Sequence, residues 1–379
     1  MAVSSPAFEP WSRAAFREFV DTCVVPYADD FDRAQEIPAS LLKQVAERGY
    51  WGAVLPVSAG GSGLDMVTIG VLHEEIGRGC SSLRSLLTVH TMVASAVRRW
   101  AKAEALERWL PGLASGDALG AFCLTEPGAG SDLTSITTTA IRDGDDYVLN
   151  GTKQWITGGQ VADVFLVFAK TERGLSAFVV DAADPGVRRK PIANILGTRA
   201  GMLAEVLFAD CRVPAHARLG ADGAGAMVAT AALDLGRYSV AAGCVGILQA
   251  CLDASVAYTA SREQGGALLR EHQLVRRMVS DMVTGVHAAR ELCRRAGELK
   301  DNRDPATLSA TWVAKYFAST NAMRAATDAV QLHGAVGCAD GHPVNRYFRD
   351  AKVMEIIEGS SQIQQLVIAE HAYESSGQP

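Results

Sequence analysis

The sequence has no cysteine pair at a spacing that would bind a metal or build a disulfide framework. Its eight cysteines, at positions 23, 80, 123, 211, 244, 251, 293 and 338, stand singly, with no Cys-X-X-Cys and no Cys/His cluster. Cys244, Cys251 and Cys293 fall in apolar stripes of helical spacing, which is typical of reduced thiols in a protein core. We therefore expect no metal site and a cytoplasmic protein.

The sequence also lacks an excess of basic charge and a targeting segment. It carries 36 Lys and Arg against 42 Asp and Glu, a net charge of −6, so the composition does not predict the basic surface that binds nucleic acid. The first ten residues have neither a basic start nor a long apolar core, and no uninterrupted apolar stretch reaches membrane-spanning length. Nucleic acids and membranes are therefore not expected partners.

Along its 379 residues the sequence shows three successive patterns. Apolar residues make up 48% of the chain, which is enough for two or three domain-sized cores. From about residue 12 to 114, apolar residues recur at helical spacing. From 117 to about 214, short β-rich segments alternate with Gly, Asp and Pro. From 223 onward, long apolar stripes predict the antiparallel helices of a four-helix bundle. We expect an α+β protein with an N-terminal all-α domain (1–116), a middle β-domain (117–219) and a C-terminal helical bundle domain (220–379).

One acid near the C-terminus has the surroundings of a general base. Glu358 stands directly before Gly-Ser-Ser-Gln and after a mostly apolar stretch, 353–357. Ser361 with Gln364 predicts a capping box that starts the last helix. We expect burial at this apolar helix junction to raise the pKa of the carboxyl toward the range useful to a base. The alternative is that Glu358 is a solvated cap residue.

Five short motifs occur in a fixed order along these patterns. They are Phe122-Cys-Leu-Thr-Glu-Pro-Gly-Ala-Gly-Ser-Asp132, Trp155-Ile-Thr157, Glu271-His-Gln273, Gln331-Leu-His-Gly334 and Glu358-Gly-Ser360. Together with the segment types, they resemble the acyl-CoA dehydrogenase family over essentially the whole chain. The resemblance implies an FAD-dependent oxidoreductase acting on the CH–CH bond of an acyl thioester: a base removes the α-proton while the β-hydride passes to flavin N5. It also implies a homodimer or homotetramer.

The resemblance assigns roles to individual residues. Glu358 matches the usual base, and the position at which some relatives carry their base is Gly236 here, which cannot titrate. The implied FAD-binding residues are Phe122, Leu124, Thr125, Gly130, Ser131, Trp155, Thr157, Arg262, Gln264, Gln273, Gln331, Gly334, Ala335, Ser360 and Gln362. In the family, the matches of Arg262, Gln273 and 331–335 reach the FAD of a neighbouring subunit. Taken alone, Trp155 would rather be interpreted as a core residue, Thr125 as a turn residue and Arg262 as an exposed helix end.

Three positions depart from the family pattern. Gly265 stands where an aromatic residue is often found, Ile357 where a Tyr often precedes the base, and Gly158 where Asn is frequent. None of these removes the catalytic acid, so they bear on FAD affinity and on the shape of the pocket.

Arg84 is the main clue to the substrate. It lies where the family shapes the far end of its acyl pocket, and it resembles the arginine with which glutaryl-CoA dehydrogenases pair the distal carboxylate of their substrate. An arginine in a dry pocket argues for a polar acyl group. An exposed helix arginine is the alternative. Ser131 and Arg237 are expected beside the phosphopantetheine arm of the substrate.

The stretch from Cys80 to His90 also resembles dehydrogenases of polyketide clusters that make hydroxymalonyl or methoxymalonyl extender units on an acyl carrier protein. A small polar acyl group on such a carrier is therefore expected. The alternatives are a short-chain or dicarboxylic acyl-CoA dehydrogenase of catabolism, a flavin oxidase or monooxygenase on the same fold, and a colourless binding subunit. The sequence does not identify the electron acceptor, for which an electron-transfer flavoprotein is one candidate.

Overall fold

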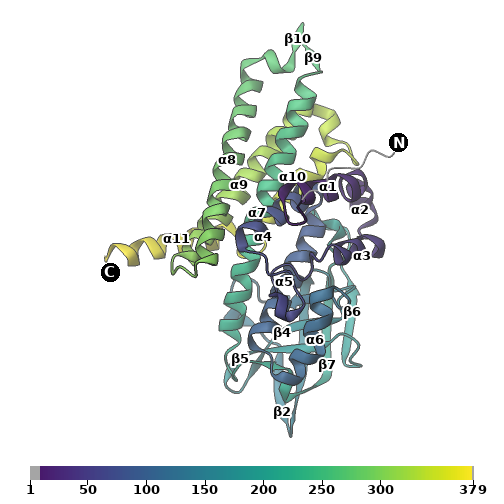
Figure 1. Ribbon diagram of the computed structural model, residues 1–379, viewed down its shortest axis with the longest axis vertical. Coiled ribbons are helices and arrows are strands. Elements are labelled where there is room, and N and C mark those ends of the chain that lie inside the picture. The colour runs from purple at the N-terminus through teal and green to yellow at the C-terminus, as the bar shows by residue number, and fades with distance from the viewer. Residues whose placement is uncertain (1–8, 378–379) are drawn as a thin grey trace. The chain divides into compact units, whose positions relative to one another are not determined.

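The computed structural model describes residues 9–377 (Figure 1), whose contacts divide them into two compact units. The helical unit comprises residues 9–32, 65–84 and 238–355. The mixed unit comprises residues 33–64, 85–237 and 356–377. The predicted succession of helical, β-rich and helical segments is present along the chain, whereas the expected domain boundaries remain a prediction.

The helices and strands are numbered in chain order. The α-helices are α1 (Arg13–Cys23), α2 (Ala28–Ala34), α3 (Ala39–Glu47), α4 (Met66–Gly79), α5 (Ser81–Trp100), α6 (Ala103–Ser115), α7 (Gly225–Thr259), α8 (Gln273–Asp301), α9 (Thr307–His333), α10 (Pro343–Met354) and α11 (Ser361–Ser376). The strands are β1 (Gly120–Cys123), β2 (Thr139–Asp143), β3 (Asp146–Ile156), β4 (Val164–Thr171), β5 (Gly174–Asp181), β6 (Val187–Pro191), β7 (Ala204–Pro214), β8 (Arg218–Leu219), β9 (Glu263–Gln264) and β10 (Ala267–Leu268).

The helical unit is built on long helices. α9 packs along α8 and α10, and α4 packs on α1 and α8. Cys244, Cys251 and Cys293 are buried thiols, as their stripes predict. Asp65 caps α4 by accepting from the Thr68 N–H at 2.7 Å. The β9–β10 hairpin joins α7 to α8 at one end of the bundle (Figure 1).

Among residues 9–377 one helix, α7, is long and apolar enough to span a membrane by length and composition alone. Asp234 and Arg237 interrupt its apolar run, which is why the sequence shows no uninterrupted stretch of that length. Of its most apolar window, 67% is buried inside the protein. Such burial is typical of a core helix in a bundle.

The mixed unit holds an eight-stranded sheet in the order β6-β7-β3-β2-β4-β5-β8, with β1 parallel to β4. β4 is buried on both faces: Val164, Leu166 and Phe168 enter one core cluster, and the alternate residues enter the other. The first cluster also contains residues of α5, α6 and the start of α7, so these helices cover that face. Because β1 lies beside β4, the sheet positions the segment that follows Cys123.

The predicted start of the last helix is wrong by one residue. Ser360, not Ser361, is the N-cap, and its Oγ accepts from the Ile363 N–H at 3.4 Å. Gly359, at φ +90, turns the chain in a left-handed conformation just before this cap. Gln364 instead donates from Nε2 to the carbonyl oxygens of Glu358 and Gly359, both at 3.3 Å. It therefore ties α11 to the turn that carries Glu358.

Candidate active site

Glu358 lies in the turn between α10 and α11 with a left-handed backbone, φ +54. A non-glycine residue in this conformation is strained, which costs on the order of 1 kcal/mol and requires support from its surroundings. Two side chains give that support by donating to the Glu358 carbonyl oxygen, Arg237 Nε at 3.1 Å and Gln364 Nε2 at 3.3 Å. The turn therefore holds the direction in which the carboxylate points.

The carboxylate of Glu358 packs against α7. Its Oε2 is buried, and a Cβ built on Gly236 would lie 2.5 Å from Oε2 and 2.9 Å from the sulfur of Met92. A glycine at 236 thus leaves the space that the carboxylate occupies. Burial lowers the pKa of Arg237, and the charge of Glu358 opposes that shift. The solvated-cap interpretation does not fit a carboxylate oxygen in this place.

Two segments that were expected to face the cofactor lie side by side in the mixed unit. The Gln154 N–H donates to the Thr125 carbonyl at 2.9 Å, which joins the segment after β1 to the end of β3. The pairing of β3 with β7 shifts register between Lys153 and Ile156. Within this bulge Trp155 has φ +62 and is 52% exposed. A bulge turns a side chain away from its regular direction, and Trp155 is therefore not a core residue.

The other expected contacts of this unit differ in exposure. Leu124 is buried, Phe122, Thr157 and Ser360 are half-buried, and Gly130, Ser131 and Gln362 are exposed. The departure at Gly158 has a backbone reason. Its φ is +70, a conformation that glycine adopts freely and that asparagine tolerates better than most residues.

The expected FAD contacts of the helical unit lie near the β9–β10 hairpin and the end of α9, at one end of the bundle (Figure 1). Tyr258 and His333 stack there at 4.3 Å and so join the ends of α7 and α9. The exposed residues at this end are Arg262, Gln264, Gln273, Gln331, Gly334 and Ala335. Gly265 and Gly266 both have positive φ, as a two-residue hairpin turn requires, which explains the missing aromatic residue.

Arg84 is buried, with 1% of its surface exposed, so the surface-helix interpretation is wrong. Its Nη2 donates to the sulfur of Met354 at 3.3 Å, and a Cβ on Gly243 would lie 2.5 Å from its Cδ. Burial, and then the nearby charge of Arg84, lower the pKa of His73 to about 3. A neutral histidine and a buried guanidinium therefore share the interior of the helical unit.

Sequence reasoning missed one buried ion pair beside the segments that are expected to face the cofactor. Lys153 Nζ lies 2.8 Å from Glu126 Oε1, and both side chains are almost fully buried. Glu126 belongs to the motif 122–132, and Lys153 stands two residues before Trp155. The signal that could have revealed them is a lysine at an inward position of an otherwise alternating strand.

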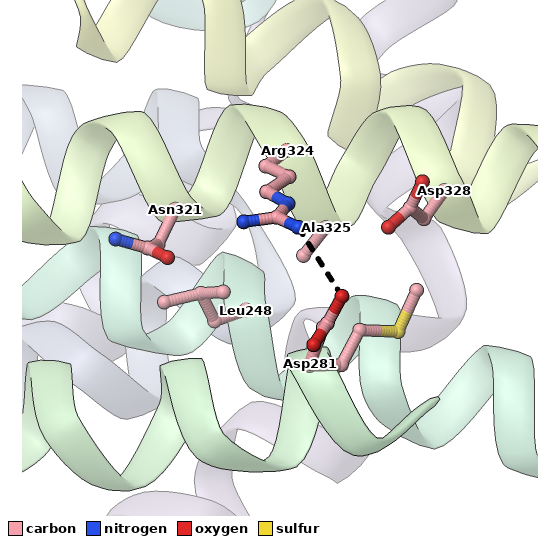
Figure 2. Close-up of a pocket in the computed structure, with 7 residues that line it drawn as sticks. Leu248, Asp281, Asn321, Arg324, Ala325 and Asp328 are labelled. Carbon is pink, nitrogen blue, oxygen red and sulfur yellow. Dashed lines mark hydrogen bonds and ion pairs between the residues drawn. The ribbon is translucent and has the colours of Figure 1, made fainter. Parts of the chain in front are cut away.

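Figure 2 shows a small polar pocket between α8 and α9, lined by Asp281, Asn321, Arg324 and Asp328 among others. Arg324 Nη2 lies 3.2 Å from Asp281 Oδ2, and burial raises the pKa of Asp328. The pocket contains none of the expected site residues. Within residues 9–377, no group of three or more His, Cys, Asp or Glu residues could hold a metal ion.

Comparison with known proteins identifies the class to which this fold and acid belong. Models of the acyl-CoA dehydrogenase N-terminal, middle and C-terminal domains match residues 11–117, 121–211 and 223–373. The short-chain specific acyl-CoA dehydrogenase of Rattus norvegicus mitochondria is 37% identical over 380 residues, covering 99% of this chain and 92% of its own.

Two solved structures extend the comparison. A glutaryl-coenzyme A dehydrogenase in complex with glutaryl-CoA has a TM-score of 0.92 at 33% identity, covering 99% of this chain and 97% of that one. FkbI, for biosynthesis of the methoxymalonyl extender unit of the polyketide FK520, has a TM-score of 0.87 at 37% identity, covering 96% and 99%. The chain belongs to the acyl-CoA dehydrogenase family, whose members are FAD-dependent oxidoreductases acting on CH–CH bonds.

The residues present fit FAD. Trp155 offers a large exposed aromatic face, which is costly to leave in water, and it directly follows Gln154, whose N–H bonds to the Thr125 carbonyl. Gly128 and Gly130 have no atom within 4 Å of a built Cβ, so the segment after β1 presents open backbone. Thr125, Trp155 and Thr157 are therefore the residues that would hold the flavin, and FAD would supply a hydride acceptor.

Proposed function

We propose that Glu358 is the base that removes the α-proton of an acyl thioester. The observation that carries this proposal is the buried Oε2, packed against Gly236 and Met92 in a turn anchored by Arg237. A carboxylate in a poorly solvated place is a stronger base than one in water. The C–H electron pair left at Cα would form the new C=C bond, and bound FAD would supply the acceptor for the β-hydride.

We further propose that the acyl group is small and polar and is carried on an acyl carrier protein, as in the making of hydroxymalonyl or methoxymalonyl extender units. The buried Arg84 and the likeness to FkbI support this substrate class. For a three-carbon acyl group with a hydroxyl on C3, loss of the α-proton and the C3 hydride gives an enol. The enol tautomerises to an aldehyde, so a CH–CH dehydrogenation oxidises C3.

The test offers matched acyl groups on coenzyme A and on a carrier protein to the purified protein under anaerobic conditions. Bleaching of the flavin is followed by stopped flow, with equal concentrations of hydroxylated and saturated three- and four-carbon acyl groups. We expect the hydroxylated carrier-bound thioester to reduce the flavin fastest. Faster reduction by butyryl-CoA than by every carrier-bound thioester would contradict the carrier proposal.

A short-chain or dicarboxylic acyl-CoA substrate is the second candidate. The 37% identity to a short-chain enzyme and the likeness to a glutaryl-CoA dehydrogenase favour it. Glutaryl-CoA in the same stopped-flow series distinguishes it, because a carboxylate at the distal end would then give the fastest bleaching. Rapid reaction of the reduced protein with oxygen would instead indicate an oxidase.

A further inference from the structure

The Glu126 carboxylate of the buried pair accepts hydrogen bonds from two threonines as well as from Lys153. Glu126 Oε2 accepts from the N–H and hydroxyl of Thr137 at 2.7 and 2.6 Å. Its Oε1 accepts from the N–H and hydroxyl of Thr138 at 2.9 and 2.5 Å, and from Lys153 Nζ at 2.8 Å. Both carboxylate oxygens are therefore saturated, and the carboxylate has one allowed orientation.

The pair connects the two segments that present Thr125 and Trp155. Lys153 Nζ also donates to the Leu124 carbonyl at 3.1 Å, one residue before Thr125. On β3, Lys153 stands at the start of the bulge in which Trp155 turns outward. The lysine thus fixes the strand on one side and the segment after β1 on the other.

A glycine in β3, Gly151, leaves the space that this network needs. Gly151 has φ +153, and a Cβ there would lie 2.4 Å from the hydroxyl of Thr138. The glycine therefore allows Thr138 to reach Glu126 behind the strand. Although burial raises it, the pKa of Glu126 falls to about 2 because Lys153 and the two threonines hydrogen-bond to its charged form.

A fully buried ion pair is rarely needed for stability alone, since apolar residues of similar volume stabilise a core equally well. What it adds is one defined geometry. We propose that Lys153 and Glu126 are positioning residues for FAD, which hold the segment 124–131 against β3 so that Thr125 and Trp155 present one preorganised flavin-binding face. This inference concerns the cofactor and is independent of the substrate proposed above.

The test compares FAD affinity with folding stability in Lys153→Met, Glu126→Gln and the double variant. The matched control is Asp222→Asn in the same unit, because Asp222 also accepts from two hydroxyls, Thr171 at 2.6 Å and Ser176 at 3.0 Å, and lies 3.3 Å from Arg218. For each full-length protein, the dissociation constant of FAD is measured by titration of the apoprotein and the unfolding temperature by calorimetry.

We expect each single variant to raise the dissociation constant of FAD at least about tenfold. The double variant should bind FAD no more weakly than the single variant that has the larger dissociation constant. Asp222→Asn should lower the unfolding temperature while the dissociation constant stays within about twofold of the unsubstituted protein. The proposal is overturned if the Lys153 and Glu126 variants also lose only stability. If Lys153→Met does not fold, Thr138→Val decides by the same two measurements, because it removes one donor to Glu126 and no charge.

Discussion

At the scale of single residues, an acid and a glycine on different elements share one small space. The Glu358 carboxylate occupies the volume that any side chain at 236 would need. A side chain at 236 would have to displace the Glu358 carboxylate, which we propose as the base.

Glu358→Gln should keep FAD and lose flavin reduction by a factor on the order of 10² or more, because the amide retains the shape but cannot accept the proton. The measurement is the anaerobic rate of bleaching with the thioester that reduces the unsubstituted protein fastest. Glu355→Gln serves as the control, since Glu355 pairs with Lys352 at 2.8 Å and should leave the rate unchanged. Normal bleaching by the Glu358 variant would place the base elsewhere.

Gly236→Ala should fold normally and still slow the reaction. Alanine favours the helix by up to about 1 kcal/mol, and the atoms it meets are the mobile ends of Glu358 and Met92. The carboxylate must move, and a displacement of about 1 Å costs on the order of 10²-fold in rate. Gly285→Ala on α8 is the matched control, because its Cβ would meet nothing closer than 3.7 Å. Equal rates in both variants would show that the observed carboxylate position is not the reactive one.

Arg84→Met should separate polar from apolar acyl groups. Loss of a charge-assisted hydrogen bond worth roughly 1.5–3 kcal/mol should slow turnover of the polar substrate at least about tenfold. Saturated short acyl thioesters should be less affected, because they carry no polar group for the guanidinium to bind. The ratio of the two rates in one protein preparation is the readout, and an unchanged ratio would mean that Arg84 is structural.

At the scale of elements, His90 joins α5 to both α6 and β1. Its Nε2 lies 2.8 Å from the Leu113 carbonyl, and its Nδ1 accepts from the Gly120 N–H at 3.2 Å. Burial lowers the pKa of His90 to about 4, although the bond to Leu113 opposes this shift. The folded protein therefore keeps a neutral imidazole at a pH at which the unfolded chain is already protonated.

Neutral His90 contributes up to roughly 3 kcal/mol to the free energy of unfolding. This contribution is complete above a pH of about 6.5 and is lost as the pH falls toward about 4. The free energies of unfolding measured with urea at pH 5 and at pH 7 should therefore differ less in His90→Gln than in the unsubstituted protein. His73 adds to the same trend in both proteins, since its pKa is lowered to about 3. An equal pH effect in the two proteins would exclude His90 as its source.

Periodicity explains which elements the sequence predicts. The long helices α7, α8 and α9 and the strands β3, β4, β5 and β7 show their spacing over many residues, whereas β8 has only two residues and β6 carries Arg-Arg-Lys. The start of α11 was misplaced because either of two adjacent serines can cap a helix. Backbone geometry decides between them.

Within the candidate site, composition and motifs indicate Glu358 but not its packing against Gly236. They also fail to show that Trp155 is exposed, because its direction follows from a bulge in β3. A register shift depends on how two strands pair, and the sequence of one strand alone does not determine that pairing. Burial of Arg84 depends likewise on helices distant in sequence.

At the scale of the whole molecule, several residues expected to contact FAD are exposed at the end of the bundle. Arg262, Gln273 and Gln331 share this end, where Tyr258 stacks on His333. In the family their matches reach the FAD of a neighbouring subunit. We therefore expect the purified protein to be a yellow dimer or tetramer with non-covalent FAD, in which each cofactor site is completed by a second copy of the chain.

Arg262→Ala tests this expectation, because an exposed residue contributes only about 0.5 kcal/mol or less to the stability of its own chain. The FAD content of the purified protein should fall while the unfolding temperature of the apoprotein stays unchanged. Arg295→Ala, an exposed residue on α8, should change neither quantity. Light scattering gives the oligomeric state of each variant at the same protein concentration. A colourless monomer that FAD cannot reconstitute would contradict the shared site, because exposed residues at the bundle end would then have no cofactor to bind.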